Sequence, residues 1–193
     1  MKVHHLPCPA LFSSTKEKSI NEVKKIALIY GTYEAVRDNN VSKETYDYLM
    51  KIYKHILENY KDKYEIEFVA HYIDELSAFK KDFPNEELRY SYDSKDYLDI
   101  YGKYDLVIGH RVHGIGMSAS LGVPGIMIAH DMRSETVDGF LASKISVGED
   151  IEKSIKLFED KIVNIKESHM KLLEHKKKFK KVFLDLLQEN ITI

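Results

Sequence analysis

The residue types best suited to chemistry lie between positions 104 and 140, in two polar clusters that each follow a short apolar run. The first cluster follows the run DLVIG and contains Arg111, His113 and Gly114. An arginine fork suits a carboxylate or phosphate, and a histidine can bind an anion or transfer a proton near neutral pH. Glycine lets a ligand approach the backbone closely. The cluster therefore indicates anion binding combined with acid–base chemistry.

The second cluster follows the apolar run PGIMIA and contains His130, Asp131, Arg133 and Glu135. Polar side chains at the ends of two successive strands point to one shared site. A histidine or aspartate at a strand end can also simply cap the following helix, so His110 or His130 alone would indicate little. The combination of the two arginines with a histidine and a carboxylate favours the shared site.

The elements that must position these clusters can be read from hydrophobic patterning. Apolar runs predict strands at 25–30, 65–72, 88–92, 105–109, 124–129 and 144–147. Helical spacing or capping predicts helices from Ser42 to Tyr60, at 93–103, at 113–121, from Glu149 onward and at the C-terminal end.

Strands that alternate with helices predict a Rossmann-like α/β fold, with a parallel sheet of order 3-2-1-4-5-6 and right-handed crossovers. Ligands of such sheets bind beyond the carboxyl ends of the strands, where the strand order reverses. Here that switch point lies between the strands at 25–30 and 105–109, next to the first polar cluster.

Composition limits the function classes. The 193 residues are 44% hydrophobic and 31% charged, with a net charge of −2, which is typical of a folded protein without a global attraction to nucleic acid or membranes. Cys8 is the single cysteine, so no intrachain disulfide can form. No apolar run approaches the ~20 residues of a membrane span, and the N-terminus does not resemble a secretory signal. We expect a cytoplasmic protein.

The chain is too short for two domains of ordinary size. Residues 1–22, with two prolines and no periodicity, are expected to form an incoming linker or edge segment. Residues 23–193 are expected to form a single α/β domain.

The two clusters resemble the C-terminal half of the polysaccharide pyruvyl transferase family. The shared motifs are an Arg-x-His-Gly turn, a Gly-x-Pro strand entry and a His-Asp-x-Arg-x-x-Glu loop, found here as RVHG at 111–114, GVP at 122–124 and HDMRSET at 130–136. The opening Cys8-Pro9 is similar to a Cys-Pro turn of the same family.

The resemblance implies half of a two-domain, glycosyltransferase-B-like (GT-B-like) architecture. It implies transfer of a pyruvyl group from phosphoenolpyruvate to hydroxyls of a sugar in a surface polysaccharide, giving a cyclic ketal. By the same resemblance, Arg111 would bind the donor and His113 would be the acid–base residue. Gly114, Asp131, Arg133 and Glu135 would contribute to substrate binding, and no cofactor or metal is expected.

The family's N-terminal half has no counterpart in this sequence. We therefore expect residues 23–193 to be the donor-binding half, with a missing N-terminal domain or a homo-oligomer as the possible complement. On that basis the chain alone is expected to be an incomplete enzyme.

Three alternatives remain from the residues themselves. The chain could be half of a nucleotide-sugar glycosyltransferase, because a helix N-terminus also binds diphosphates. It could be a metal hydrolase that uses His110, His113, His130 and Asp131, although Arg111 in their midst would repel a cation. It could also be a non-catalytic interaction module. For the lysine-rich run at 166–181, a solvated helix face is the favoured interpretation.

Overall fold

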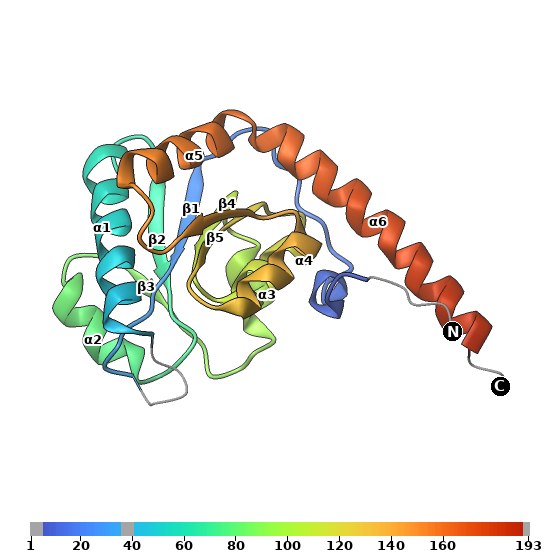
Figure 1. The fold of residues 1–193 in the computed structure, drawn as a ribbon, viewed down its shortest axis with the longest axis horizontal. Coiled ribbons are helices and arrows are strands. Elements are labelled where there is room, and N and C mark those ends of the chain that lie inside the picture. Colours follow the sequence, from blue (N-terminus) through green and yellow to red (C-terminus); the bar gives the residue numbers. More distant parts are fainter. Residues whose placement is uncertain (1–5, 36–40, 191–193) are drawn as a thin grey trace.

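The computed structural model of the protein describes residues 6–35 and 41–190. Within these residues a six-stranded parallel sheet has the order β3-β2-β1-β4-β5-β6, which confirms the predicted topology (Figure 1). The strands are β1 (Lys25–Ile29), β2 (Glu65–Val69), β3 (Leu88–Arg89), β4 (Leu106–Gly109), β5 (Gly125–Ala129) and β6 (Ser143–Ser146).

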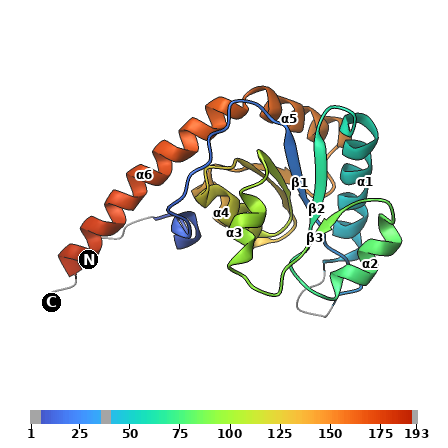
Figure 2. The same ribbon diagram turned by 180° about the vertical axis from the view of Figure 1, so that it is seen from behind.

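Helices cover both faces of the sheet. One face carries α1 packed beside α5, and the other carries α3 and α4 together with two 3-10 helices, η1 and η2 (Figures 1 and 2). The helices are η1 (Pro9–Phe12), α1 (Lys43–Tyr60), α2 (Glu75–Asp82), α3 (Asp96–Tyr101), α4 (Val112–Ser120), η2 (Met132–Phe140), α5 (Ile151–Val163) and α6 (Ile165–Asn190).

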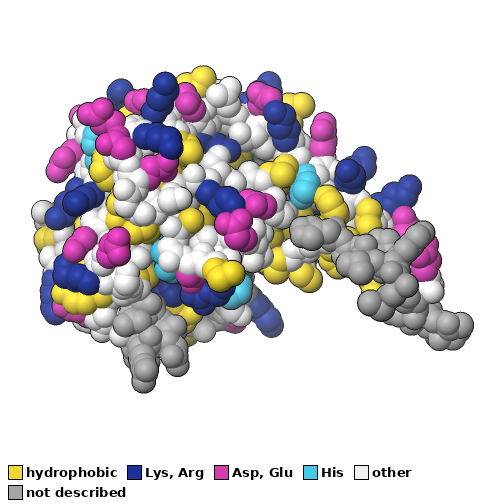
Figure 3. All heavy atoms as spheres, viewed as in Figure 1, with side chains coloured by type: hydrophobic (Ala, Val, Ile, Leu, Met, Phe, Trp, Pro, Cys, Tyr) yellow, Lys and Arg dark blue, Asp and Glu magenta, His cyan; other side chains and the backbone are white. Residues whose placement is uncertain are grey.

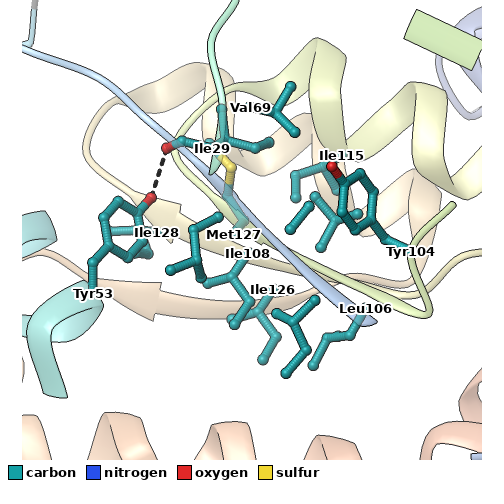
Figure 4. Packing of buried hydrophobic residues seen from close by; sticks show 14 of the residues in the cluster. Ile29, Tyr53, Val69, Tyr104, Leu106, Ile108, Ile115, Ile126, Met127 and Ile128 are labelled. Atoms are coloured by element: carbon teal, nitrogen blue, oxygen red, sulfur yellow. Dashed lines mark hydrogen bonds between the residues drawn. The ribbon is translucent and has the colours of Figure 1, made fainter. Parts of the chain in front are cut away.

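The buried side of α1 faces the sheet. The Ser42 side chain accepts a hydrogen bond from the Thr45 backbone N–H and caps the helix as expected. Tyr53 is fully buried, and its hydroxyl donates to the Ile29 carbonyl at 2.7 Å (Figure 4). The central strands β1, β4 and β5 are buried on both faces, as is typical of a parallel sheet. This packing fixes where each strand ends, and therefore where the site residues begin.

Two regions depart from the predicted elements. The stretch 73–92 contains an unpredicted helix, α2, whose Phe79 packs edge-on against Tyr30 with ring centroids 5.2 Å apart. The loop after β5, expected to be irregular, forms η2. α2 has no side-chain N-cap, whereas η2 is capped by Asp131. Both elements also bury side chains against the rest of the domain, such as Phe79 of α2 and Phe140 of η2.

The N-terminal segment runs beside α6 (Figures 1 and 2). The Phe12 and Phe183 rings meet edge to face at 5.1 Å, and the Lys18 backbone N–H donates to the Leu121 carbonyl at 2.9 Å. Among residues 6–24 the regular structure is η1, and no strand is present there. Of the two alternatives for this segment, an edge strand therefore has no support in the described part.

The lysine-rich run at 166–181 lies along α6, and most of its lysines are exposed, as predicted. Lys176 is the exception, because it is buried and donates to the Ser120 carbonyl at 2.7 Å. On the face shown in Figure 3, basic and acidic side chains are interspersed. No helix within the described ranges has the length and apolar character needed to cross a membrane.

Candidate functional site

Both polar clusters line a single cavity of about 310 Å³ beyond the carboxyl ends of β4 and β5. The predicted shared site is therefore formed by residues from separate loops. The side chains around the cavity are Cys8, Ala10, Val41, His71, Tyr72, His110, Arg111, Val112, His113, His130, Asp131, Arg133, Thr136 and Phe140.

The N-terminus of α4 borders this cavity. Arg111 is the N-cap residue and provides no side-chain cap, and the first backbone N–H to bond back into the helix is that of Ile115, which donates to the Arg111 carbonyl at 3.1 Å. The N–H groups of residues 112–114 therefore have no partner within the helix. With the helix dipole they favour an anion at this end of the cavity. His113 is exposed on the same turn, within reach of such an anion.

Arg111 is held against the cavity wall from two sides. Its Nη2 donates to Oε1 of the fully buried Glu75 at 2.5 Å, and its guanidinium lies 4.6 Å from the centroid of the Tyr72 ring. Burial raises the pKa of the Glu75 carboxyl, and this effect outweighs the opposing influence of Arg111. The Arg111 side chain is 15% exposed, so it is largely immobilised before any ligand arrives.

Three histidines form a neutral wall of the cavity. Burial, assisted by the nearby Arg111, lowers the pKa of His71 to about 3, and its Nε2 shares a 2.6 Å hydrogen bond with the Tyr101 hydroxyl. Burial also lowers the pKa values of His110 and His130. These three rings are therefore uncharged at neutral pH.

His110 is the deepest of the three, at 2% exposed. Its ring fills the space beside Gly31, where a Cβ atom would lie 2.3 Å from the imidazole. Neither ring nitrogen makes a well-formed hydrogen bond within the described part of the chain, although the nearby Ile29 carbonyl weakly favours its protonated form. His110 therefore presents an uncharged donor and acceptor at the cavity wall.

Asp131 and Arg133 form a paired group at the cavity rim. The Asp131 carboxylate caps η2 by accepting the Arg133 backbone N–H at 2.9 Å, and it also accepts from Arg133 Nε at 2.8 Å. Partial burial opposes ionisation of Asp131, but the hydrogen bonds from Arg133 lower its pKa. The Arg133 side chain is 78% exposed, so its charge lies at the solvent edge of the site.

Two of the predicted substrate-binding residues are not among the cavity-lining residues. Glu135 lies on η2, where its carboxylate pairs with Lys144 Nζ at 2.9 Å. Gly114 is buried against β1 and does not line the cavity, and a Cβ atom at this position would lie 2.5 Å from Ile29 Cδ1. The glycine thus allows α4 to approach β1 closely.

His71 and Tyr72 line the cavity and Glu75 contacts Arg111, and none of the three was among the predicted site residues. They follow β2, whose carboxyl end is one strand away from the switch point. The predicted strand order is the signal that could have directed attention to this loop.

As for the metal alternative, no three His, Cys, Asp or Glu side chains in the described ranges are grouped so that they could hold a metal ion.

The family is decided by a match to the model described as polysaccharide pyruvyl transferase, which covers residues 1–132. The chain belongs to the polysaccharide pyruvyl transferase family. The match includes Arg111, His113, Gly114 and Asp131, and the family model therefore spans the first polar cluster and the start of the second. No curated protein is significantly similar to the chain in sequence.

Solved structures with the same fold include carbohydrate-related enzymes. The glycosyltransferase of kitacinnamycin has a TM-score of 0.53 and 12% sequence identity, and the match covers 92% of this chain and 46% of that chain. A protein assigned as a UDP-N-acetylglucosamine 2-epimerase from Listeria monocytogenes has a TM-score of 0.53 and 16% identity, with 100% of this chain and 50% of that chain covered. The glycosyltransferase VinC in complex with dTDP has a TM-score of 0.51 and 12% identity, with 95% of this chain and 44% of that chain covered. At these identities the likeness establishes the fold alone. The chain spans half or less of the length of each.

Proposed function

We propose that this pyruvyl transferase family member is the donor-binding half of an enzyme that transfers a pyruvyl group from phosphoenolpyruvate to a sugar of a surface polysaccharide. The observation that carries the proposal is the cavity at the α4 N-terminus. There Arg111, His113 and Arg133 come together from two loops, beside helix N–H groups suited to an anion.

The cavity suits the charge distribution of phosphoenolpyruvate. The donor has a phosphate and a carboxylate next to an uncharged methylene carbon. The α4 N-terminus and Arg111 offer donors to one anionic group, and Arg133 at the rim offers positive charge to the other. The neutral wall of His71, His110 and His130 adds no competing charge. The polar loops thus complement a small anion with an uncharged end.

The residues also fit the chemistry of ketal formation. Two sugar hydroxyl oxygens form bonds to the central carbon of the donor, while the bond from that carbon to the phosphate oxygen breaks. Of the two hydroxyl protons, one ends on the methylene carbon, which becomes a methyl group, and the other leaves with the phosphate. His113, exposed at the cavity, is the proposed acid–base residue for these transfers. Arg111 and the helix N–H groups stabilise the departing phosphate.

The first test is binding. Phosphoenolpyruvate, inorganic phosphate and UDP should be titrated separately into the chain by calorimetry. We expect phosphoenolpyruvate to bind more tightly than phosphate, and Arg111→Lys to weaken it by about tenfold because lysine cannot form the planar fork. Absence of binding would contradict the proposal. Preference for UDP would instead support the glycosyltransferase-half alternative, which the fold of VinC and its dTDP complex makes worth testing.

The second test is turnover. We expect the 193-residue chain to release no phosphate from phosphoenolpyruvate in a sugar-dependent manner, because one half leaves the donor exposed and the acceptor unpositioned. The same assay should be run with a complementary N-terminal half of another family member, and with His113→Gln. Sugar-dependent release by this chain alone, lost in His113→Gln, would show that it is complete. Phosphate release only with the added half would support the proposal that this chain binds the donor and needs a second half for transfer.

A further inference from the structure

Glu75 is a buried carboxylate that connects two loops around the cavity without lining the cavity itself. Its Oε2 accepts the backbone N–H groups of His71 at 2.9 Å and Tyr72 at 3.1 Å, in the loop after β2. Its Oε1 accepts Arg111 Nη2 at 2.5 Å, from the loop after β4. One carboxylate therefore joins the backbone of one loop to a side chain of the other.

We propose that Glu75 is a positioning residue that holds Arg111 in the orientation needed to receive the donor's anionic group. A long, flexible arginine loses conformational freedom when it binds a ligand, and this cost falls when the side chain is ordered beforehand. Glu75 orders one end of the guanidinium, and the Tyr72 ring, 4.6 Å away, orders its flat face. Only the identity of the anion rests on the proposed function.

A purely structural role for Glu75 is the competing interpretation. Glu75 is the first residue of α2, and its acceptance of two loop N–H groups could serve only to anchor that helix. A third possibility is that the carboxylate competes with the ligand for Arg111, which would make binding weaker than it could be. The three roles make different predictions for the mobility of Arg111 and for anion affinity.

Glu67 provides a matched control, because it is also a buried glutamate paired with an arginine. Its carboxylate accepts hydrogen bonds from Arg89, at 2.7 Å from Nη2, and it lies outside the cavity. Glu67→Gln and Glu75→Gln remove the same charge and keep the same side-chain size. Any effect that both share reflects the loss of a buried carboxylate, and any effect specific to Glu75→Gln reflects its place beside the site.

The first measurement is the rate at which phenylglyoxal modifies each arginine in the folded chain, followed by peptide mass mapping. Arg133, Arg89 and Arg111 have side-chain exposures of 78%, 42% and 15%, so Arg111 should react slowest of the three in the wild type. In Glu75→Gln the rate at Arg111 should rise about fivefold, because the amide offers a neutral and weaker partner. In Glu67→Gln the increase should occur at Arg89 and not at Arg111.

The second measurement is anion affinity, with inorganic phosphate and phosphoenolpyruvate as the probes. Glu75→Gln should weaken both by about tenfold, and Glu67→Gln should leave both unchanged. Unchanged or tighter binding in Glu75→Gln would overturn the proposal in favour of the structural or the competing role. An equal loss in Glu67→Gln would overturn it as well.

Failure of the proposed function and failure of the positioning role can be separated. If neither anion binds the wild type, the donor assignment fails, and the modification rates alone decide the role of Glu75. If Glu75→Gln does not fold, Glu75→Asp replaces it, since the carboxylate is then one methylene shorter. A faster rate at Arg111 in Glu75→Asp supports the proposal, and an unchanged rate overturns it.

Discussion

Glu67 in β2 and Glu75 at the start of α2 are two buried glutamates paired with arginines, and their surroundings differ. Glu67, in the middle of β2, accepts hydrogen bonds from Lys25 at 2.9 Å, from Arg89 at 2.7 Å and from the Tyr104 hydroxyl at 2.7 Å. Burial alone would raise its pKa, but these three partners lower the pKa of Glu67 to about 2. Glu75, at the edge that carries the cavity, has Arg111 as its one cationic partner among the described residues, and its pKa is raised.

The difference separates a cluster remote from the cavity from one that we propose to be functional. At Glu67 two cations surround one anion, and the group lies away from the cavity. At Glu75 the single cation also faces the cavity, beside neutral histidines whose pKa values burial lowers. Buried titratable groups with shifted pKa values recur at functional sites. The following predictions test this contrast, from the largest expected effect to the smallest.

Arg111→Met should lower the free energy of unfolding by about 4 kcal/mol at pH 7, because it leaves the Glu75 carboxylate buried without its cation. Urea denaturation measures this loss. The double variant Arg111→Met/Glu75→Gln should recover about half of it, since no charge then remains buried. A single-variant loss below about 1 kcal/mol would mean that Arg111 does not stabilise the buried carboxylate.

Glu67→Gln should lower the free energy of unfolding by about 3 kcal/mol. The expected loss is smaller because the Arg89 side chain is 42% exposed and can be rehydrated. Phosphate affinity should not change. Urea denaturation combined with phosphate titration checks both parts, and a drop in affinity would show that the two regions are coupled.

The two glutamates should give opposite pH dependences of stability. Because the pKa of Glu67 is depressed in the folded state, its contribution is present above the ordinary value of 4.5 and is lost as pH falls toward about 2. This loss should be roughly 2 kcal/mol after allowance for solvent screening. Because the folded pKa of Glu75 is raised, its contribution is present below 4.5 and is lost as pH rises through the folded value.

Urea midpoints measured between about pH 3 and 7 test this contrast for the wild type, Glu67→Gln and Glu75→Gln. The stability difference between wild type and Glu67→Gln should shrink toward acid pH. The stability difference between wild type and Glu75→Gln should shrink toward higher pH. If both stability differences changed with pH in the same direction, the distinction between the two glutamates would be contradicted.

Arg133→Ala should have the smallest effect. Its guanidinium is largely exposed and already paired with Asp131, so anion affinity should fall only about threefold. The free energy of unfolding should change by less than about 0.5 kcal/mol. Calorimetric titration at low and high salt measures the anion affinity. A loss of affinity as large as that of Arg111→Lys would place Arg133 in direct contact with the ligand.

Much of the fold and part of the site could be predicted from local patterns. The apolar runs before Arg111 and His130 indicated two buried strands, and alternation with helices indicated the strand order. Because parallel strands end at one edge of a sheet, the two polar clusters were expected to meet there, and they line one cavity. These inferences rest on regularities of backbone geometry that hold for many sequences.

The loop after β2 could not be predicted in the same way. None of its residues was predicted to belong to the site, and α2, which begins at Glu75, was missed because its buried face is short. The partner of Glu75 lies 36 residues away along the chain. Conversely, Glu135 fits the family motif, yet its carboxylate pairs with Lys144 on the next strand.

The sequence by itself determined the periodicity of the elements, the order of the parallel strands and the edge at which ligands should bind. These depend on short-range hydrophobic patterns and on the handedness of the backbone. The tertiary structure alone decided which polar groups meet and which of them are buried. Burial and pairing set the low pKa values of the cavity histidines and the opposite shifts of Glu67 and Glu75. Such shifts arise from contacts between distant residues, and no local pattern encodes them.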